Sequence, residues 1–168
     1  MIARTNIESS LKTINANYKK PSTPPKVALF LSKLALLELC GWIEESMDDV
    51  VLRCARKHLR DQDNLDFVKK IIIKKNYGFD YVMNFRKMLV GVIGLVNVER
   101  LERAVDQAKK DQLEAALDSL KTIRNSQAHT HIRGVTTTIN APSWTISQFA
   151  PVYEGLIEFD RWLRTTKL

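Results

Sequence analysis

Apolar and polar residues alternate along most of the chain with the period of an α-helix. Residues 5–18 predict an amphipathic helix, whose apolar stripe consists of Ile7, Leu11, Ile14 and Tyr18. The segment KKPSTPPK that follows cannot continue this helix, because its prolines lack the backbone N–H that a helix needs. A second, long helix is expected over residues 26–59. Its first half is apolar on nearly every side, so it must be surrounded by its own domain or by a second subunit.

Capping residues mark the shorter helices that follow. A turn with an Asp or Asn cap is expected to open a short basic helix that Gly78 ends, and Asp80 is expected to cap a helix over residues 81–93. Gly94 suits the end of that helix, and another helix is expected to start at Asn97. The spacing of these caps predicts short helices joined by tight connections.

Two further helices are expected toward the C-terminus. The first begins at Asp111, because Glu114 three positions later completes a pair that resembles a capping box. A long loop over residues 130–143 follows, with the β-prone patch VTTTI inside it, and the last helix begins at Ser147 or a neighbour. The pattern therefore predicts an all-α fold, built as a helical bundle.

Length and composition fit one soluble domain. The chain of 168 residues is long enough for one core, which we assign to residues 26–168, with residues 1–20 as an N-terminal helical extension. The first residues, MIARTNIESS, lack the apolar segment of a signal peptide. The longest apolar run, residues 27–43, is interrupted by charged side chains and so indicates a buried helix rather than a membrane span. We expect a cytoplasmic protein without a membrane partner.

The chain is strongly basic, with a formal net charge of +7 and a pI near 9.5. A small domain this basic tends to meet an acidic partner, of which nucleic acid is the commonest, although the charge could serve solubility alone. One side of the long helix carries four cations at spacings i, i+3, i+4 and i+7 that could follow an RNA backbone: Arg53, Arg56, Lys57 and Arg60. A second group consists of Lys69, Lys70, Lys74 and Lys75. Taken alone, each group fits a solvated helix face better.

The cysteines give no sign of a metal or cofactor site. Cys40 and Cys54 both lie inside apolar helical patterns, so we expect buried, reduced thiols. No Cys or His spacing typical of a metal site occurs in the chain. We therefore expect no cofactor.

The segment RNSQAHTH, residues 124–131, places an arginine on a core stripe. Three leucines lie on one line of the preceding helix: Leu113, Leu117 and Leu120. Arg124 differs in direction from Leu117 by only roughly 20°. Burying a guanidinium without a partner costs several kcal/mol, so a carboxylate of the fold, the last carbonyls of a helix or an anionic ligand must satisfy it. Glu38, alone in an apolar helix, is one candidate carboxylate, but it could pair with Lys33 or Arg53 instead. Alternatively, the helix ends here and Arg124 reaches water.

The two histidines of this segment are candidates for proton transfer. His129 lies five residues after Arg124, roughly 140° away if the helix continues, and could swing back if the helix unwinds near Ser126. A second arrangement brings Arg124 and His129 of two copies together in one cleft of a dimer. A lone histidine is usually structural, but one beside an inward-aimed arginine on a basic protein suggests chemistry.

The segment RNSQAH resembles the R-x4-6-H motif of HEPN domains, including the polar residue, here Asn125, that often follows the arginine. In that family the motif lies at the end of a helix in a small helical bundle, and a loop and a last helix follow, as predicted here for residues 26–166. Many HEPN proteins are metal-independent endoribonucleases that act as toxins or antiviral effectors. They work as dimers with a composite site. The resemblance therefore implies RNA and a second copy as partners, and a partner could also be an antitoxin or regulatory protein.

The resemblance implies roles that fit the chemistry of the residues. His129 would act as base or acid on the 2′-OH or the 5′ leaving oxygen, and Arg124 would bind the phosphate oxygens. Asn125 would orient the histidine or donate to the phosphate. His131 could be a second acid or base, or a loop residue bonded to a backbone carbonyl. It stands where one HEPN subgroup has a tyrosine that its partner modifies, so that mode of neutralisation is in doubt here.

Two other functions compete with the nuclease. The first is a non-catalytic HEPN-like domain that binds RNA or nucleotide, or serves as a scaffold for a partner protein. The second is a plain helical dimerisation module in which the motif is accidental. RNA binding without product would favour the first of these over the nuclease.

Overall fold

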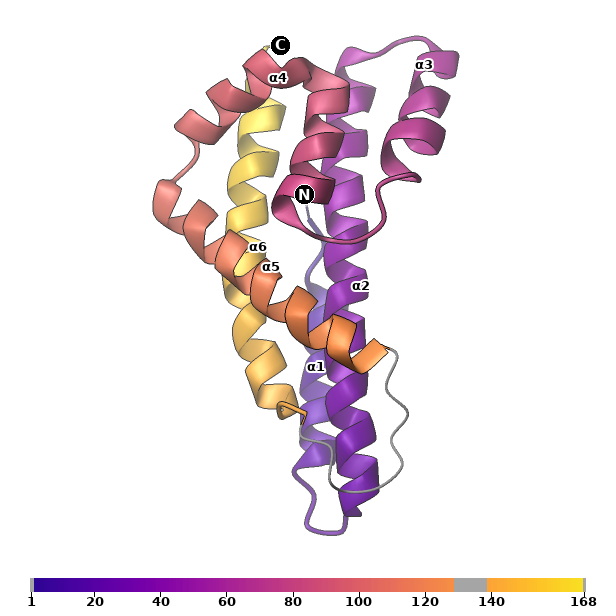
Figure 1. Cartoon of the computed structure of the whole chain (residues 1–168), viewed down its shortest axis with the longest axis vertical. Coiled ribbons are helices and arrows are strands. Elements are labelled where there is room, and N and C mark those ends of the chain that lie inside the picture. The colour runs from indigo at the N-terminus through magenta and orange to yellow at the C-terminus, as the bar shows by residue number, and fades with distance from the viewer. Residues whose placement is uncertain (1, 129–138, 168) are drawn as a thin grey trace.

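All regular secondary structure within residues 2–128 and 139–167, the part of the chain that this computed structural model describes, is helical (Figure 1). The helices are α1 (Thr5–Tyr18), α2 (Pro25–His58), α3 (Gln62–Phe67), α4 (Lys87–Ala104), α5 (Gln107–Ala128) and α6 (Pro142–Thr165), with the π-helical segments η1 (Val68–Ile73) and η2 (Tyr81–Arg86). The prediction of an all-α fold is confirmed for these residues.

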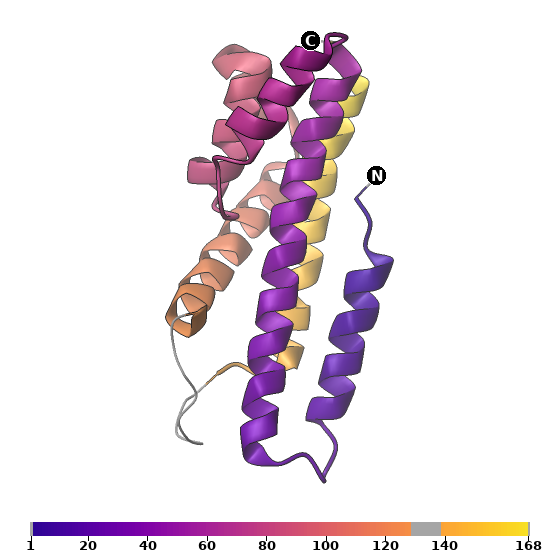
Figure 2. The same cartoon turned by 90° about the vertical axis from the view of Figure 1, so that its right-hand side faces the viewer.

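The long helix α2 is the element on which the others pack. Helix α6 lies alongside it, α1 packs against both, and α5 crosses α2 and α6 obliquely (Figures 1 and 2). The core between them is apolar, and its largest fully buried side chains include Leu36, Leu39, Ile43, Met47, Leu113, Leu117, Phe85 and Phe159. Helix α1 belongs to the same core, because its predicted stripe buries Ile7, Leu11 and Ile14.

The upper end of the bundle is formed by α3, η1, η2 and the kinked helix α4. Gly94 produces the kink with φ 77° and ψ 158°, a left-handed value of φ that glycine adopts without steric cost. The predicted Asp80 cap is confirmed, since its Oδ1 accepts a hydrogen bond of 2.7 Å from the backbone N–H of Met83. Tyr81 and Phe85 pack against Phe159 with ring centroids 5.7 and 5.4 Å apart, which attaches this end to α6.

One helical stretch of the described residues, Tyr81–Ala104, is long and apolar enough to cross a membrane by length and composition alone. It includes both η2 and α4. A third of its most apolar window is buried within the protein, and Gly94 interrupts its helical backbone.

Two helix starts differ from the sequence prediction. Helix α5 begins at Gln107 rather than at Asp111, because Asp106 accepts a hydrogen bond of 3.1 Å from the backbone N–H of Lys109 and so provides the cap. Glu114, predicted to complete a capping box with Asp111, instead forms an ion pair of 2.8 Å with Lys110.

Helix α6 begins at Pro142, five residues before the predicted Ser147. Proline suits the first turn of a helix because the N–H that it lacks would have no partner there. Pro151 lies inside α6 without ending it. The predicted loop therefore ends earlier than expected, and residues 129–138 of it lie outside the described part of the chain.

Candidate functional site

Arg124 lies in the last turns of α5 and reaches toward α2. Its Nη2 is 3.4 Å from Oε1 of Glu44, and its Nη1 donates a hydrogen bond of 3.2 Å to Oδ1 of Asn125. The side chain is 38% exposed. Arg124 thus pairs with a carboxylate of the fold and also reaches water. The sequence had left these two possibilities open as alternatives, and the structure shows both.

The carboxylate that pairs with Arg124 is not the one considered from the sequence. Glu38 is exposed and lines a groove between α1 and α2, whereas Glu44, six residues later, faces the end of α5. Six residues correspond to roughly 600° of helical rotation, so the two side chains point in directions roughly 120° apart. The expectation that Glu38 is the partner of Arg124 is therefore wrong.

The α2 surface beneath Arg124 also carries a thiol and a second carboxyl. Cys40, one turn before Glu44, is buried, and burial raises its pKa to about 12. The positive charge of Arg124 lowers this pKa, and the negative charge of Glu44 raises it. A thiol with this pKa stays protonated and is a poor nucleophile at neutral pH. The prediction that Cys40 is a buried, reduced core residue is confirmed.

Asp48, one turn after Glu44, is the one described carboxyl of α2 with a pKa moved toward neutrality. Burial raises its pKa to about 6, and the negative charges of Glu44, Asp49 and Glu45 add to the effect. The sequence analysis did not single out Glu44 or Asp48. The signal was present in the segment EESMDD, whose acidic residues repeat at the i, i+4 spacing of one helix face.

Replacing Asp48 with asparagine tests how much the burial of its carboxylate and the negative charges around it destabilise the fold. The folded protein binds the Asp48 proton more tightly than the unfolded chain does, so stability falls as the pH rises from about 4 to about 6. A shift of this size corresponds to about 3 kcal/mol, which partial solvent exposure reduces to about 1 kcal/mol. We therefore expect Asp48→Asn to be more stabilising at pH 7.5 than at pH 4 by about 1 kcal/mol, measured by urea unfolding. An equal difference at both pH values would contradict it.

The remaining motif residues are only partly placed. Asn125 is exposed beside Arg124, and Ser126 donates from Oγ to the carbonyl of Ile123 at 2.7 Å. Gln127 is buried, and its Oε1 accepts no hydrogen bond from the described residues. Because α5 remains helical to Ala128, it does not unwind at Ser126. The proposed catalytic histidines, His129 and His131, lie outside the described residues.

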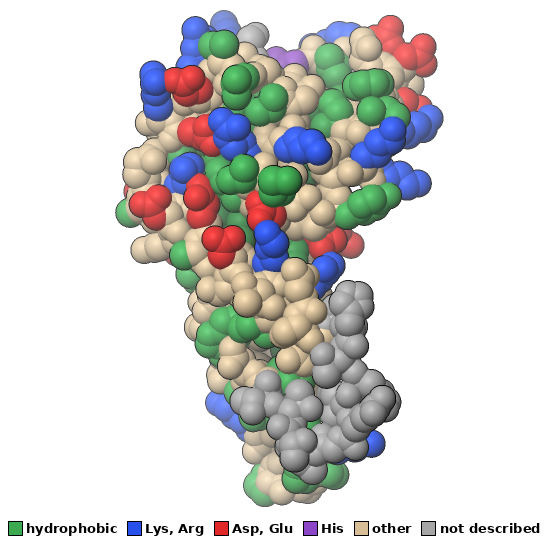
Figure 3. All heavy atoms as spheres, in the orientation of Figure 1, with side chains coloured by type: hydrophobic (Ala, Val, Ile, Leu, Met, Phe, Trp, Pro, Cys, Tyr) green, Lys and Arg blue, Asp and Glu red, His purple; other side chains and the backbone are tan. Residues whose placement is uncertain are grey.

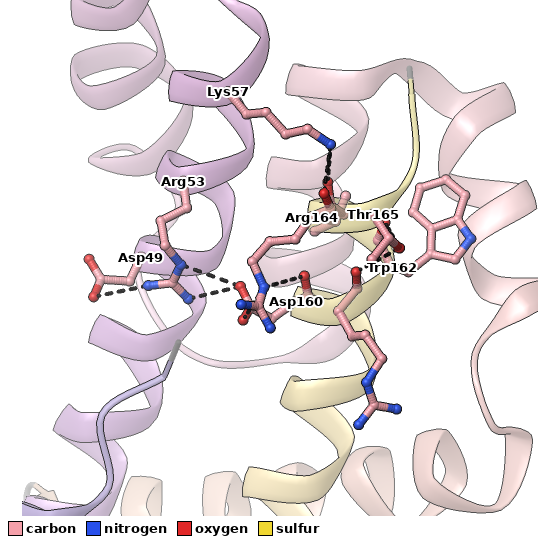
Figure 4. Close-up of polar contacts among 9 residues, drawn as sticks. Asp49, Arg53, Lys57, Asp160, Trp162, Arg164 and Thr165 are labelled. Atoms are coloured by element: carbon pink, nitrogen blue, oxygen red, sulfur yellow. Dashed lines mark hydrogen bonds and ion pairs between the residues drawn. The ribbon is translucent and has the colours of Figure 1, made fainter.

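The four cations predicted to follow RNA do not act as one free stripe. Figure 4 shows Arg53 between two carboxylates: its Nε and Nη2 donate to Oδ1 of Asp160 at 3.3 and 3.1 Å, and its Nη1 is 3.5 Å from Asp49. Lys57 donates from Nζ to three backbone oxygens at the end of α6, those of Leu163, Arg164 and Thr166. Both side chains join α2 to α6. Arg56 and Arg60 are exposed.

The second basic group also contains both ion-paired and exposed lysines. Lys69 and Lys70 form ion pairs of 3.7 and 3.2 Å with Asp66, while Lys74 and Lys75 are exposed. Figure 3 shows cationic side chains interspersed with acidic ones over the upper part of one face, without a continuous basic patch. On that face, therefore, the cations do not gather into one groove.

The described residues hold no cluster of three or more His, Cys, Asp and Glu side chains that could bind a metal ion. Comparison of the chain with protein-family models, with curated proteins and with solved structures produced no match.

Proposed function

We propose that the protein is a metal-independent endoribonuclease of the HEPN type, acting as a dimer, with Arg124 as the phosphate-binding residue of its site. The observation that supports this most is the state of Arg124. A residue on the core line of α5 keeps a half-exposed guanidinium that only one carboxylate, Glu44, contacts at 3.4 Å within the described residues. A guanidinium has five N–H donors, so several remain for a phosphate.

The proposed reaction needs one base, one acid and one fixed positive charge. A base removes the proton of the 2′-OH, the 2′ oxygen attacks the adjacent phosphorus, and the bond from phosphorus to the 5′ oxygen breaks. An acid protonates the departing oxygen, which leaves a 2′,3′-cyclic phosphate and a 5′-OH. His129 is the proposed proton-transfer residue, His131 a second candidate, and Asn125 a donor to the phosphate. Arg124 would stabilise the charge that develops on the phosphate oxygens.

The biological role that we propose is that of a toxin or antiviral effector in the cytoplasm. RNA is the substrate, a second copy completes the composite site, and an antitoxin or regulatory protein would restrain the activity. The RNA-binding contribution of Arg56 and Arg60, the two exposed members of the predicted stripe, belongs to the same proposal.

Cleavage of RNA in EDTA tests the proposal. The parent protein is expected to release products with cyclic-phosphate ends, and Arg124→Ala to lower the rate by roughly 100-fold or more, as loss of a donor to a transition-state oxyanion does. Arg100→Ala is the matched control, because Arg100 is exposed on α4 and its one described side-chain contact is at 3.5 Å to Asn97. Circular dichroism would confirm that each variant is folded.

Two results would contradict the nuclease. Equal cleavage by the parent and by Arg124→Ala would place the activity at another site or in a contaminant. RNA binding by the parent without any product, across structured and unstructured RNA, would favour the non-catalytic binding domain instead.

A further inference from the structure

Helix α2 carries a row of apolar side chains that the described residues leave partly exposed. We call this row the α2 stripe, and its members are Val27, Phe30, Leu34 and Leu37. Each residue is 40% to 48% exposed, whereas the apolar residues on the opposite side of α2, such as Leu36, Leu39 and Ile43, are buried in the core. A continuous exposed apolar row marks an interaction surface more often than single exposed residues do.

The α2 stripe has the spacing of a helix that packs lengthwise on another helix. Its members follow one another after three, four and three residues. At roughly 100° per residue they fall within an arc of roughly 80°. This alternation defines the a and d positions of a heptad, whose side chains pack into the spaces of a partner helix. Gly41 continues the line, and a Cβ added there would meet no atom within 4 Å.

Neighbouring helices leave this side of α2 open. In Figure 2, α6 lies behind α2, α1 lies to one side, and no helix of the described residues crosses the near side of its lower half. A groove between α1 and α2 runs beside the stripe and contains cavities of about 480 and 310 Å³. Leu34 and Leu37 contribute to its walls, together with short polar side chains of α1: Asn6, Ser9, Ser10 and Thr13. The stripe and groove together offer room for the side chains of a partner helix.

Charges on the two flanks of the stripe indicate both the occupant and its direction. Over the length of the stripe, Glu38 lies on one flank, and Lys26 and Lys33 lie on the other. Beyond Gly41, Glu45 continues the acidic flank, and Glu44 lies on the side of the lysines. Two copies of α2 packed antiparallel would place each flank against itself, so that glutamates face glutamates. Parallel packing places the acidic flank of one copy against the basic flank of the other. The helix is therefore complementary to itself in both its apolar row and its charges.

We propose that the α2 stripe is the dimerisation surface of the protein, on which α2 of a second copy packs in parallel. A closed two-fold pair of parallel helices is in register, so each residue of the stripe contacts the same residue of the partner copy. The part that this second copy would play in a composite nuclease site rests on the proposed function. The contact surface itself rests on α2 alone.

Sedimentation velocity over a roughly hundredfold range of protein concentration tests the surface. The parent protein is expected to be dimeric. Leu34→Glu and Leu37→Glu are expected to weaken association at least roughly 100-fold, because each buries a charge at the centre of the interface. Val96→Glu is the matched control, since Val96 is an exposed apolar residue of α4, remote from the stripe in sequence, and its replacement should leave the dimer intact.

A cross-link tests the direction. In a background with Cys40→Ala and Cys54→Ala, Val27→Cys and Leu37→Cys are each expected to form a disulfide-linked dimer on mild oxidation, because only a parallel, in-register pair brings both positions against their own copies. Val96→Cys in the same background should remain unlinked.

Each outcome decides between the alternatives. A parent protein that stays monomeric, or a Leu34→Glu variant that stays dimeric, would overturn the surface. A dimer that requires Leu34 but does not cross-link at both position 27 and position 37 would overturn the parallel arrangement. Because sedimentation is measured without RNA, a stripe-dependent dimer that cleaves no RNA would refute the proposed function and leave the dimerisation surface standing. A monomeric protein that cleaves RNA through Arg124 would overturn the dimerisation surface and the composite site, and would leave the nuclease activity standing.

Discussion

Replacing Asp160 with alanine is expected to destabilise the fold by about 2–3 kcal/mol, because it removes a buried carboxylate that accepts charge-assisted hydrogen bonds. Asp160 lies on α6 with a side chain that is 1% exposed. It accepts hydrogen bonds of 3.3 and 3.1 Å from Arg53 of α2, and its Oδ2 is 3.2 Å from Nε of Arg164 (Figure 4). Without the carboxylate, two guanidinium groups at the α2–α6 contact would have no common counter-ion.

The chain contains a matched control for this experiment. Asp49 also contacts Arg53, at 3.5 Å, but its side chain is 69% exposed, so Asp49→Ala is expected to cost less than about 1 kcal/mol. Both variants remove one carboxylate from the same arginine and differ in burial. Urea unfolding at pH 7, followed by circular dichroism, would measure the two losses. Equal losses would show that burial of Asp160 is not what makes its ion pair important.

The helices could be predicted from the sequence because their signals are local. Apolar periodicity located α1 and α2 to within a residue at their starts, and Asp80 revealed its helix through a contact three residues away. Where two residues offered the same capping signal, the sequence prediction chose the wrong one. Asp106 and Asp111 both offer a cap for α5, and the structure uses the earlier one.

Only the part of the candidate site that depends on local patterns could be predicted from the sequence. The position of Arg124 follows from periodicity alone, but its partner Glu44 lies 80 residues away on another helix. A contact at such a separation depends on how α5 crosses α2, which no local pattern specifies. The same holds for Arg53 and Asp160, 107 residues apart, whose pairing turns one of the four predicted RNA-binding cations into a structural contact.

Replacing Gly155 with valine is expected to destabilise the fold by about 3 kcal/mol, because it overfills the closest approach between α5 and α6. A Cβ at Gly155 would lie 2.5 Å from Cβ of Leu113, and the branched methyl groups of valine would add further overlap. Gly41→Val is the control, and it is made in the Leu34→Glu background because Gly41 continues the α2 stripe. Gly41 is also helical, but its Cβ would meet nothing within 4 Å, so the stability should stay within about 0.5 kcal/mol of that background.

A double-mutant cycle isolates the cause of the Gly155 effect. Leu113 is fully buried, and Leu113→Ala alone should cost about 2–5 kcal/mol through the cavity that it leaves. Leu113→Ala removes Cγ and Cδ2, each 3.1 Å from a Cβ added at Gly155, but keeps the Cβ of residue 113 at 2.5 Å, so it relieves part of the overlap. The double variant should therefore lose at least about 1 kcal/mol less than the sum of the two single losses, as measured by urea unfolding. Strictly additive losses would mean that the Cγ and Cδ atoms of Leu113 are not what excludes a side chain at position 155.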